Sequence, residues 1–164
     1  MNLRIEIRYA VLISLLTLLW LALEFMIGLH DKYIQYHPVV TMFALIIPIF
    51  CSRLAIKEKT AQLNGEIAFK QAFMTGLLVA AFASVLTVQC QYAFHKFINP
   101  GFFQSMIEYS TARAAVLHMD VSKAKAEATM YFNLPSYIMQ CFFSTLFFGV
   151  IISLVMAWRM RTVK

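Results

Sequence analysis

The sequence predicts an all-α integral membrane protein built as a four-helix bundle. Apolar residues make up 61% of the 164-residue chain and charged residues only 13%, whereas a soluble domain usually carries about 25% charged residues. Four apolar stretches cover residues 9–29, 38–55, 72–94 and 137–158. Each is close to the ~20 residues that cross ~30 Å of hydrocarbon as a helix. We therefore expect one membrane domain over residues 1–164.

The first stretch follows Arg4 and Arg8, as the apolar core of a signal peptide would follow its basic region. The apolar run is about 20 residues long, which exceeds the ~7–15 residues of a signal peptide, and no small-residue cleavage site follows it. We interpret it as an uncleaved first span that ends near Gly28.

The second stretch contains two prolines with different expected effects. Pro38 suits the first turn of a helix, where the missing N–H group has no partner to lose. Pro48 lies inside the span, so it is expected to kink the helix. A polar and basic loop over residues 56–71, with an Asn64-Gly65 turn signal, then leads to the third span.

Residues 95–136 form a long segment between the third and fourth spans. An Asn-Pro-Gly sequence at 99–101 ends the third helix. Residues 102–117 have the spacing of an amphipathic helix, and residues 122–132 form a second helical run capped by Asp120 or Ser122. We expect these helices either to lie on the outer leaflet or to cap the bundle.

The distribution of Lys and Arg predicts the orientation. If the N-terminus is cytoplasmic, nine cations face the cytoplasm and five face outside, which agrees with the positive-inside rule. Both termini are then cytoplasmic and residues 95–136 lie outside. The inner set is Arg4, Arg8, Arg53, Lys57, Lys59, Lys70, Arg159, Arg161 and Lys164, and the outer set is Lys32, Lys96, Arg113, Lys123 and Lys125.

Small residues recur every fourth position in the third and fourth spans. Such stripes let helix backbones approach closely, so we interpret them as packing surfaces within the chain or between chains. The residues concerned are Gly76, Ala80 and Ser84 in the third span and Thr145, Gly149 and Ser153 in the fourth.

Glu24 is the acidic residue that lies well inside a span, and an ionisable group there is a functional hypothesis by default. At ~1.5 Å per helical residue, Glu24, Gln89, Gln91 and Gln140 all lie ~6–9 Å beneath the outer boundary. These residues predict a polar layer that forms a pocket for a proton, a cation or a small polar solute. Two alternatives are a protonated Glu24 that hydrogen-bonds a glutamine, and a Glu24 shallow enough to reach interfacial water.

Metal binding and catalysis have little support in the sequence. Imidazole and carboxylate groups suit zinc or copper, and the weak candidates are His30, His37, His95 and His118, with Asp31 and Asp120. They show neither H-x-x-x-H nor H-E-x-x-H spacing, so we expect no metal and no cofactor. A G-x-S-x-G motif and a glycine-rich phosphate loop are also absent. The net charge of +6 resides at the span ends, which indicates the lipid bilayer as partner and no nucleic acid.

The run LNGEIAFKQAFMTG at residues 63–76, with INPGF at 98–102, resembles a family of small bacterial four-span membrane proteins catalogued as a domain of unknown function. The resemblance implies four helices and the bacterial inner membrane. It brings no activity and no site residues.

Three functions remain open from the sequence. The first is a non-enzymatic interaction protein or accessory subunit of a membrane assembly, with a membrane protein or a homo-oligomer as partner. The second is a small transporter or channel subunit that uses the polar layer around Glu24. The third, which has the least support, is a metalloenzyme at the outer face.

Overall fold

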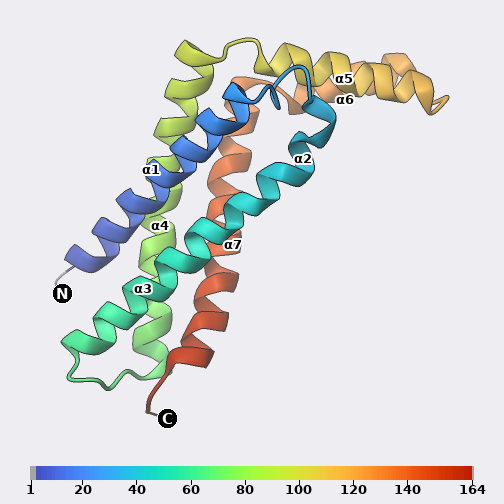
Figure 1. Ribbon diagram of the computed structural model, residues 1–164. Coiled ribbons are helices and arrows are strands. Elements are labelled where there is room, and N and C mark those ends of the chain that lie inside the picture. The colour runs from blue at the N-terminus through green and yellow to red at the C-terminus, as the bar shows by residue number, and fades with distance from the viewer. Residues whose placement is uncertain (1–2, 164) are drawn as a thin grey trace.

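The computed structural model describes residues 3–163, and within this range the chain is helical with no strand apart from an isolated Ala68–Val163 bridge. Four long apolar helices pack side by side, which confirms the predicted all-α membrane bundle (Figure 1). All four are long and apolar enough to span a membrane, so the chain is a multi-pass membrane protein. They are α1 (Arg4–Met26), the composite Ile34–Gln62 helix, α4 (Phe69–Ala93) continued by η3 (Phe94–Ile98), and α7 (Leu134–Met160).

The Ile34–Gln62 helix is irregular before Pro48. It consists of η1 (Ile34–Tyr36), α2 (His37–Val40), η2 (Thr41–Leu45) and α3 (Ile46–Gln62). Pro48 has no N–H group to donate to the carbonyl four residues earlier, so a regular α-helical ladder cannot run through this point. The chain takes a tighter 3-10 turn over Thr41–Leu45 instead.

Helices α4 and α7 form the most extensive helix pair in the bundle. They approach so closely that a Cβ atom added at Gly149 would lie 2.3 Å from Ala80 Cβ, and one added at Gly76 would lie 2.6 Å from Ser153 Oγ. Ser153 is fully buried, and its hydroxyl donates to the carbonyl of Gly149 at 2.6 Å. Ser84 is also buried, whereas Thr145 lines a cavity described below.

Both ends of the chain lie at one end of the bundle, together with the loop between α3 and α4 (Figure 1). Thr162 Oγ1 accepts a hydrogen bond from the backbone N–H of Ile67 at 2.7 Å, and Lys59 Nζ donates to the buried Glu6 at 3.0 Å. Buried apolar side chains fill this half of the bundle, including Ile5, Ala10, Ile13, Cys51, Ala55, Val79 and Ala83. We call this end the terminal end.

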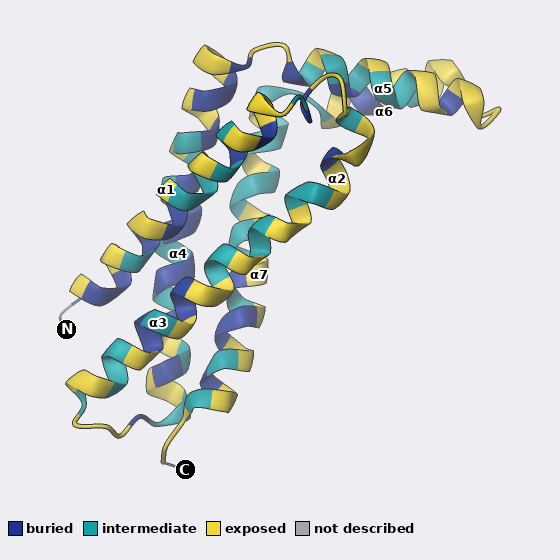
Figure 2. Ribbon diagram, viewed as in Figure 1, coloured by how far each residue is buried: buried dark blue, intermediate teal, exposed yellow. Residues whose placement is uncertain are grey.

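The opposite end carries a helical hairpin made of α5 (Phe102–Val116) and α6 (Val121–Tyr131). Asp120 caps α6 by accepting a hydrogen bond from the Lys123 N–H at 3.0 Å. The hairpin extends sideways from the four long helices, so most of its length lies beside the bundle and does not cover its end (Figure 1). Most of its residues are exposed or half-buried (Figure 2). We call this end the hairpin end.

Candidate functional site

Glu24, His30 and His37 come together at the hairpin end of the bundle although they belong to three successive pieces of chain. Glu24 lies in the last turns of α1, His30 in the turn that follows, and His37 at the start of α2. The chain reverses at Gly28, whose φ of +80° favours glycine because other residues rarely adopt it. This reversal brings His30 back beside the helix that carries Glu24.

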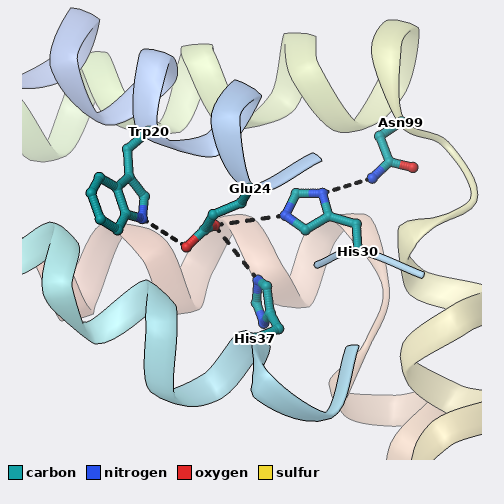
Figure 3. A network of polar contacts seen from close by, with 5 residues as sticks. All are labelled: Trp20, Glu24, His30, His37 and Asn99. Atoms are coloured by element: carbon teal, nitrogen blue, oxygen red, sulfur yellow. Dashed lines mark hydrogen bonds and ion pairs between the residues drawn. The ribbon is translucent and has the colours of Figure 1, made fainter. Parts of the chain in front are cut away.

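The three side chains present their polar atoms to one another (Figure 3). Glu24 Oε2 lies 3.7 Å from His30 Nε2 and 3.9 Å from His37 Nε2. All three residues are buried, with exposed fractions of 2%, 2% and 6% in chain order. Both distances exceed the 2.7–3.2 Å of a normal hydrogen bond, so the imidazoles surround the carboxylate oxygen without bonding to it.

Two further polar residues hold this group in place. Trp20 Nε1 donates to the other carboxylate oxygen, Glu24 Oε1, at 2.7 Å, and both residues lie on one face of α1. The amide nitrogen of Asn99, just after η3, lies 2.9 Å from His30 Nδ1. Helix α1 and the end of the third span therefore fix the carboxylate and one imidazole from opposite sides (Figure 3).

Aromatic rings enclose the group on the side of the hairpin. Phe102, the first residue of α5, is 1% exposed. Its ring centroid lies 4.9 Å from that of His30, 5.3 Å from that of His37 and 4.8 Å from that of His95. Tyr137 of α7 packs against His95 with a centroid distance of 5.2 Å. The polar atoms thus lie in a largely apolar shell.

Several polar atoms in this region have no hydrogen-bond partner among the described residues. They are Glu24 Oε2, His30 Nε2 and both ring nitrogens of His95. A buried polar group left unsatisfied costs about 1–3 kcal/mol, so such a cluster is unlike ordinary packing. In the described part of the chain, Glu24, His30 and His37 are also the group whose ligand atoms all lie within 4.8 Å, close enough to hold a metal ion.

The predicted polar layer is divided among three places. Glu24 is paired with Trp20 and the histidines, whereas Gln91 and Gln140 line a cavity one turn deeper in the bundle. Gln89 is exposed and lines a groove between α1 and α4. Within the helical segments, the layer is split because Gln89 and Gln91 are two residues apart and so face different directions.

The cavity has a volume of about 320 Å³ and lies between α1, the Ile34–Gln62 helix, α4 and α7. Gln91 is nearly fully buried, and its Oε1 has no partner among the described residues. Thr41 and Gln91 line the cavity, one helical turn from His37 and His95 respectively, so it lies directly beneath the cluster. Ile13 and Gly149 line it as well, and Ile13 belongs to the apolar core of the terminal half.

Of the remaining metal candidates, His95 lies next to this group and the others lie apart from it. His95 lies beside His30, with a centroid distance of 6.3 Å. His118 is exposed where α5 ends. Asp31 accepts a hydrogen bond from the adjacent Lys32 N–H, and Asp120 caps α6. The sequence spacing of Glu24, His30 and His37 matches no metal-binding motif, because a turn separates the first two and an irregular segment precedes the third.

A family model described as "Protein of unknown function (DUF4199)" matches residues 8–162 of the chain. No curated protein and no solved structure matches the chain.

Proposed function

The chain belongs to the DUF4199 family, and we propose that it acts in the bacterial inner membrane as a non-enzymatic interaction protein, an accessory subunit of a membrane assembly. The single observation that supports this role is the α5–α6 hairpin, which projects beyond the bundle that anchors it (Figure 1).

The hairpin exposes large apolar side chains at its far end. Met119 is 60% exposed and Val116 is 77% exposed, and Leu117 and Val121 beside them are exposed as well. Besides Phe102, which packs on the histidines, the buried residues of α5 and α6 are Met106, Ala114 and Ala128, so the apolar side chains at the tip stay uncovered. An exposed apolar patch of this kind marks a surface for protein or membrane contact.

The direction of the hairpin favours a partner in the same membrane. It extends to the side of the bundle and not away from its end (Figure 1), so its apolar tip reaches over the neighbouring lipid or protein. We therefore propose that the apolar tip binds an integral membrane protein that stands beside the bundle, either a different chain or a second copy of this one.

The orientation follows from the charges at the two ends. The terminal end carries Arg53, Lys57 and Lys59 near the end of the Ile34–Gln62 helix, whereas the first loop at the hairpin end has Lys32 alone. Under the positive-inside rule the terminal end is cytoplasmic. The hairpin and the Glu24 cluster then face the outer side.

Site-specific photo-crosslinking in native membranes tests this role. A photoreactive residue at Met119, in the apolar tip, is expected to give an adduct of discrete mass with a membrane protein. The same residue at Glu127, an exposed polar position on α6, is the matched control and should give much less. An adduct of twice the chain mass identifies a second copy as the partner. Lipid adducts alone at Met119 would overturn the proposed role.

A second candidate, a transporter or channel subunit, is favoured by the cavity beneath the Glu24 cluster. Its polar lining includes Thr17, Thr41 and Gln91. The apolar core of the terminal half closes the route toward the cytoplasmic end, so transport requires a rearrangement or a second copy. Proton or cation flux into proteoliposomes tests this role: flux above that of empty vesicles is expected, and Glu24→Gln should abolish it. Flux that is unchanged in Glu24→Gln, or absent from the native chain, would exclude the role.

A further inference from the structure

We propose that Glu24, His30 and His37 form a binding site for a divalent transition-metal ion at the hairpin end of the bundle. The ligand atoms are Glu24 Oε2, His30 Nε2 and His37 Nε2, which are the atoms that face one another in the cluster. This inference does not depend on the role of the hairpin, and each can fail without the other.

The spacing of the three atoms fits a shared ion better than direct hydrogen bonds. Zinc binds imidazole nitrogen at ~2.0–2.1 Å and carboxylate oxygen at ~2.0–2.2 Å, so two ligands of a tetrahedral ion lie about 3.3–3.5 Å apart. The two separations from Glu24 Oε2, 3.7 Å and 3.9 Å, need to close by only a few tenths of an ångström. The ligand atoms of the two histidines lie within 4.8 Å of each other, so the imidazoles have to move together by up to about 1.5 Å. Rotation of the two histidine side chains can supply movements of this size.

The outer partners of the ligands match those of known metal sites. A metal-bound carboxylate usually accepts a hydrogen bond on its free oxygen, and a metal-bound imidazole donates its other N–H group. Trp20 Nε1 bonds to Glu24 Oε1 at 2.7 Å and leaves Oε2 for the ion. If the Asn99 amide turns by half a rotation, its oxygen accepts the N–H of His30 Nδ1, and the lone pair of Nε2 is then available.

The burial of Glu24, His30 and His37 indicates a metal-binding site and not a solvated polar surface. The exposed fractions of all three residues are below one tenth. Glu24 Oε2 and His30 Nε2 have no hydrogen-bond partner among the described residues. A metal ion satisfies both atoms at once, and it neutralises the carboxylate inside a shell of aromatic rings.

The ligand set limits the metal. Two imidazoles and one carboxylate are typical of zinc sites with one open position and of ferrous iron sites with open positions. Calcium and magnesium are disfavoured because they require mostly oxygen ligands. We therefore assign the site to zinc or ferrous iron, which share this chemistry.

Metal titration of the purified full-length chain in lipid nanodiscs tests the site. After metal removal with a chelator, zinc is added in one series and ferrous iron, without oxygen, in another. The native chain is expected to bind one ion, and the metal that binds more tightly identifies the class. Glu24→Gln and His30→Ala should each lose this binding. His118→Ala removes an exposed histidine outside the cluster, so it should bind as the native chain does.

Three readouts keep the test decisive if a ligand variant fails to fold. Cobalt added to the native chain should give the visible absorption of a four- or five-coordinate ion with nitrogen and oxygen ligands. Trp20→Phe removes one outer hydrogen bond and keeps all three ligands, so zinc affinity should fall about 10–100-fold. In a Trp158→Phe background Trp20 is the remaining tryptophan, and its emission should shift when the site fills.

The proposal fails if neither zinc nor ferrous iron binds the native chain at one ion per chain. It also fails if Glu24→Gln and His30→Ala, when correctly folded, bind as tightly as His118→Ala. An unchanged zinc affinity in Trp20→Phe would contradict the proposal that Trp20 holds Glu24 Oε1 and leaves Oε2 for the ion.

Discussion

Replacement of Gly149 by alanine tests the closest helix contact in the bundle. The added Cβ would lie 2.3 Å from Ala80 Cβ and 3.4 Å from Ala80 Cα. Carbon atoms in contact prefer a separation of about 3.5–4.0 Å, so the two atoms must separate by about 1.2–1.7 Å. Ala80 Cβ is bonded directly to the backbone and cannot rotate away. Helices α4 and α7 therefore have to move apart.

The expected cost is that of an overpacked core, about 1–3 kcal/mol. The loss applies to the free energy of unfolding, measured by denaturation of the chain in bicelles with increasing SDS. Val155→Leu is the matched control, because it adds one methylene on the exposed face of α7, where lipid accommodates it. That variant should unfold at nearly the same SDS concentration as the native chain.

The double variant Ala80→Gly/Gly149→Ala separates steric conflict from a general effect of alanine at Gly149. Ala80→Gly removes the carbon atom that the new methyl group meets, although glycine in a helix costs about 1 kcal/mol by itself. The coupling energy between the two changes should be about 0.5–3 kcal/mol and favourable. A Gly149→Ala chain as stable as Val155→Leu, or changes that simply add, would refute the close contact.

Two other predictions concern topology and Glu24. In a cysteine-free background, single cysteines at Lys59 and Arg161 should be protected from an impermeant reagent added outside, and those at Arg113 and Lys123 should react; the reverse pattern would overturn the orientation. Without metal, Glu24→Gln should be nearly as stable as the native chain, because its amide oxygen can still accept the hydrogen bond from Trp20. Glu24→Leu should lose about 0.6–2 kcal/mol of unfolding free energy, the value of a hydrogen bond between transmembrane groups. Equal SDS denaturation of the two variants would contradict the Trp20–Glu24 bond.

The helices of this fold could be predicted from sequence because each depends on local features. A run of ~20 apolar residues is sufficient to indicate a span. The hairpin between the third and fourth spans was likewise visible from the helical spacing and from the cap at Asp120. The structure decides between the two possible caps, because the Asp120 side chain accepts the hydrogen bond of α6.

The site was only partly predictable because it depends on a turn and on packing between helices. Depth along the helix axis placed Glu24 near the glutamines, but depth says nothing of the direction in which a side chain points. Glu24 instead faces His30, which the reversal at Gly28 brings back toward α1. His30 and His37 were recognisable as residue types. Their meeting with Glu24 required the path of the loop, which no spacing rule describes.

The position of Glu24 limits how its charge can be accommodated. A charged side chain at the centre of a transmembrane helix costs about 2.5–3.5 kcal/mol. Glu24 lies two residues before the end of α1, where the cost is smaller, and the hydrogen bond from Trp20 offsets part of it. The remaining compensation must come from a proton on the carboxyl group, from a protonated His30 or His37, or from a bound cation. Charge-assisted hydrogen bonds are about 2.7–2.9 Å long, whereas both histidines lie farther away, which disfavours the second option. If Glu24 is protonated, Glu24→Gln should preserve stability and zinc should have no effect. If Glu24 binds a cation, zinc should stabilise the native chain but not Glu24→Gln. Unfolding of both chains with and without zinc therefore distinguishes the two states of this site.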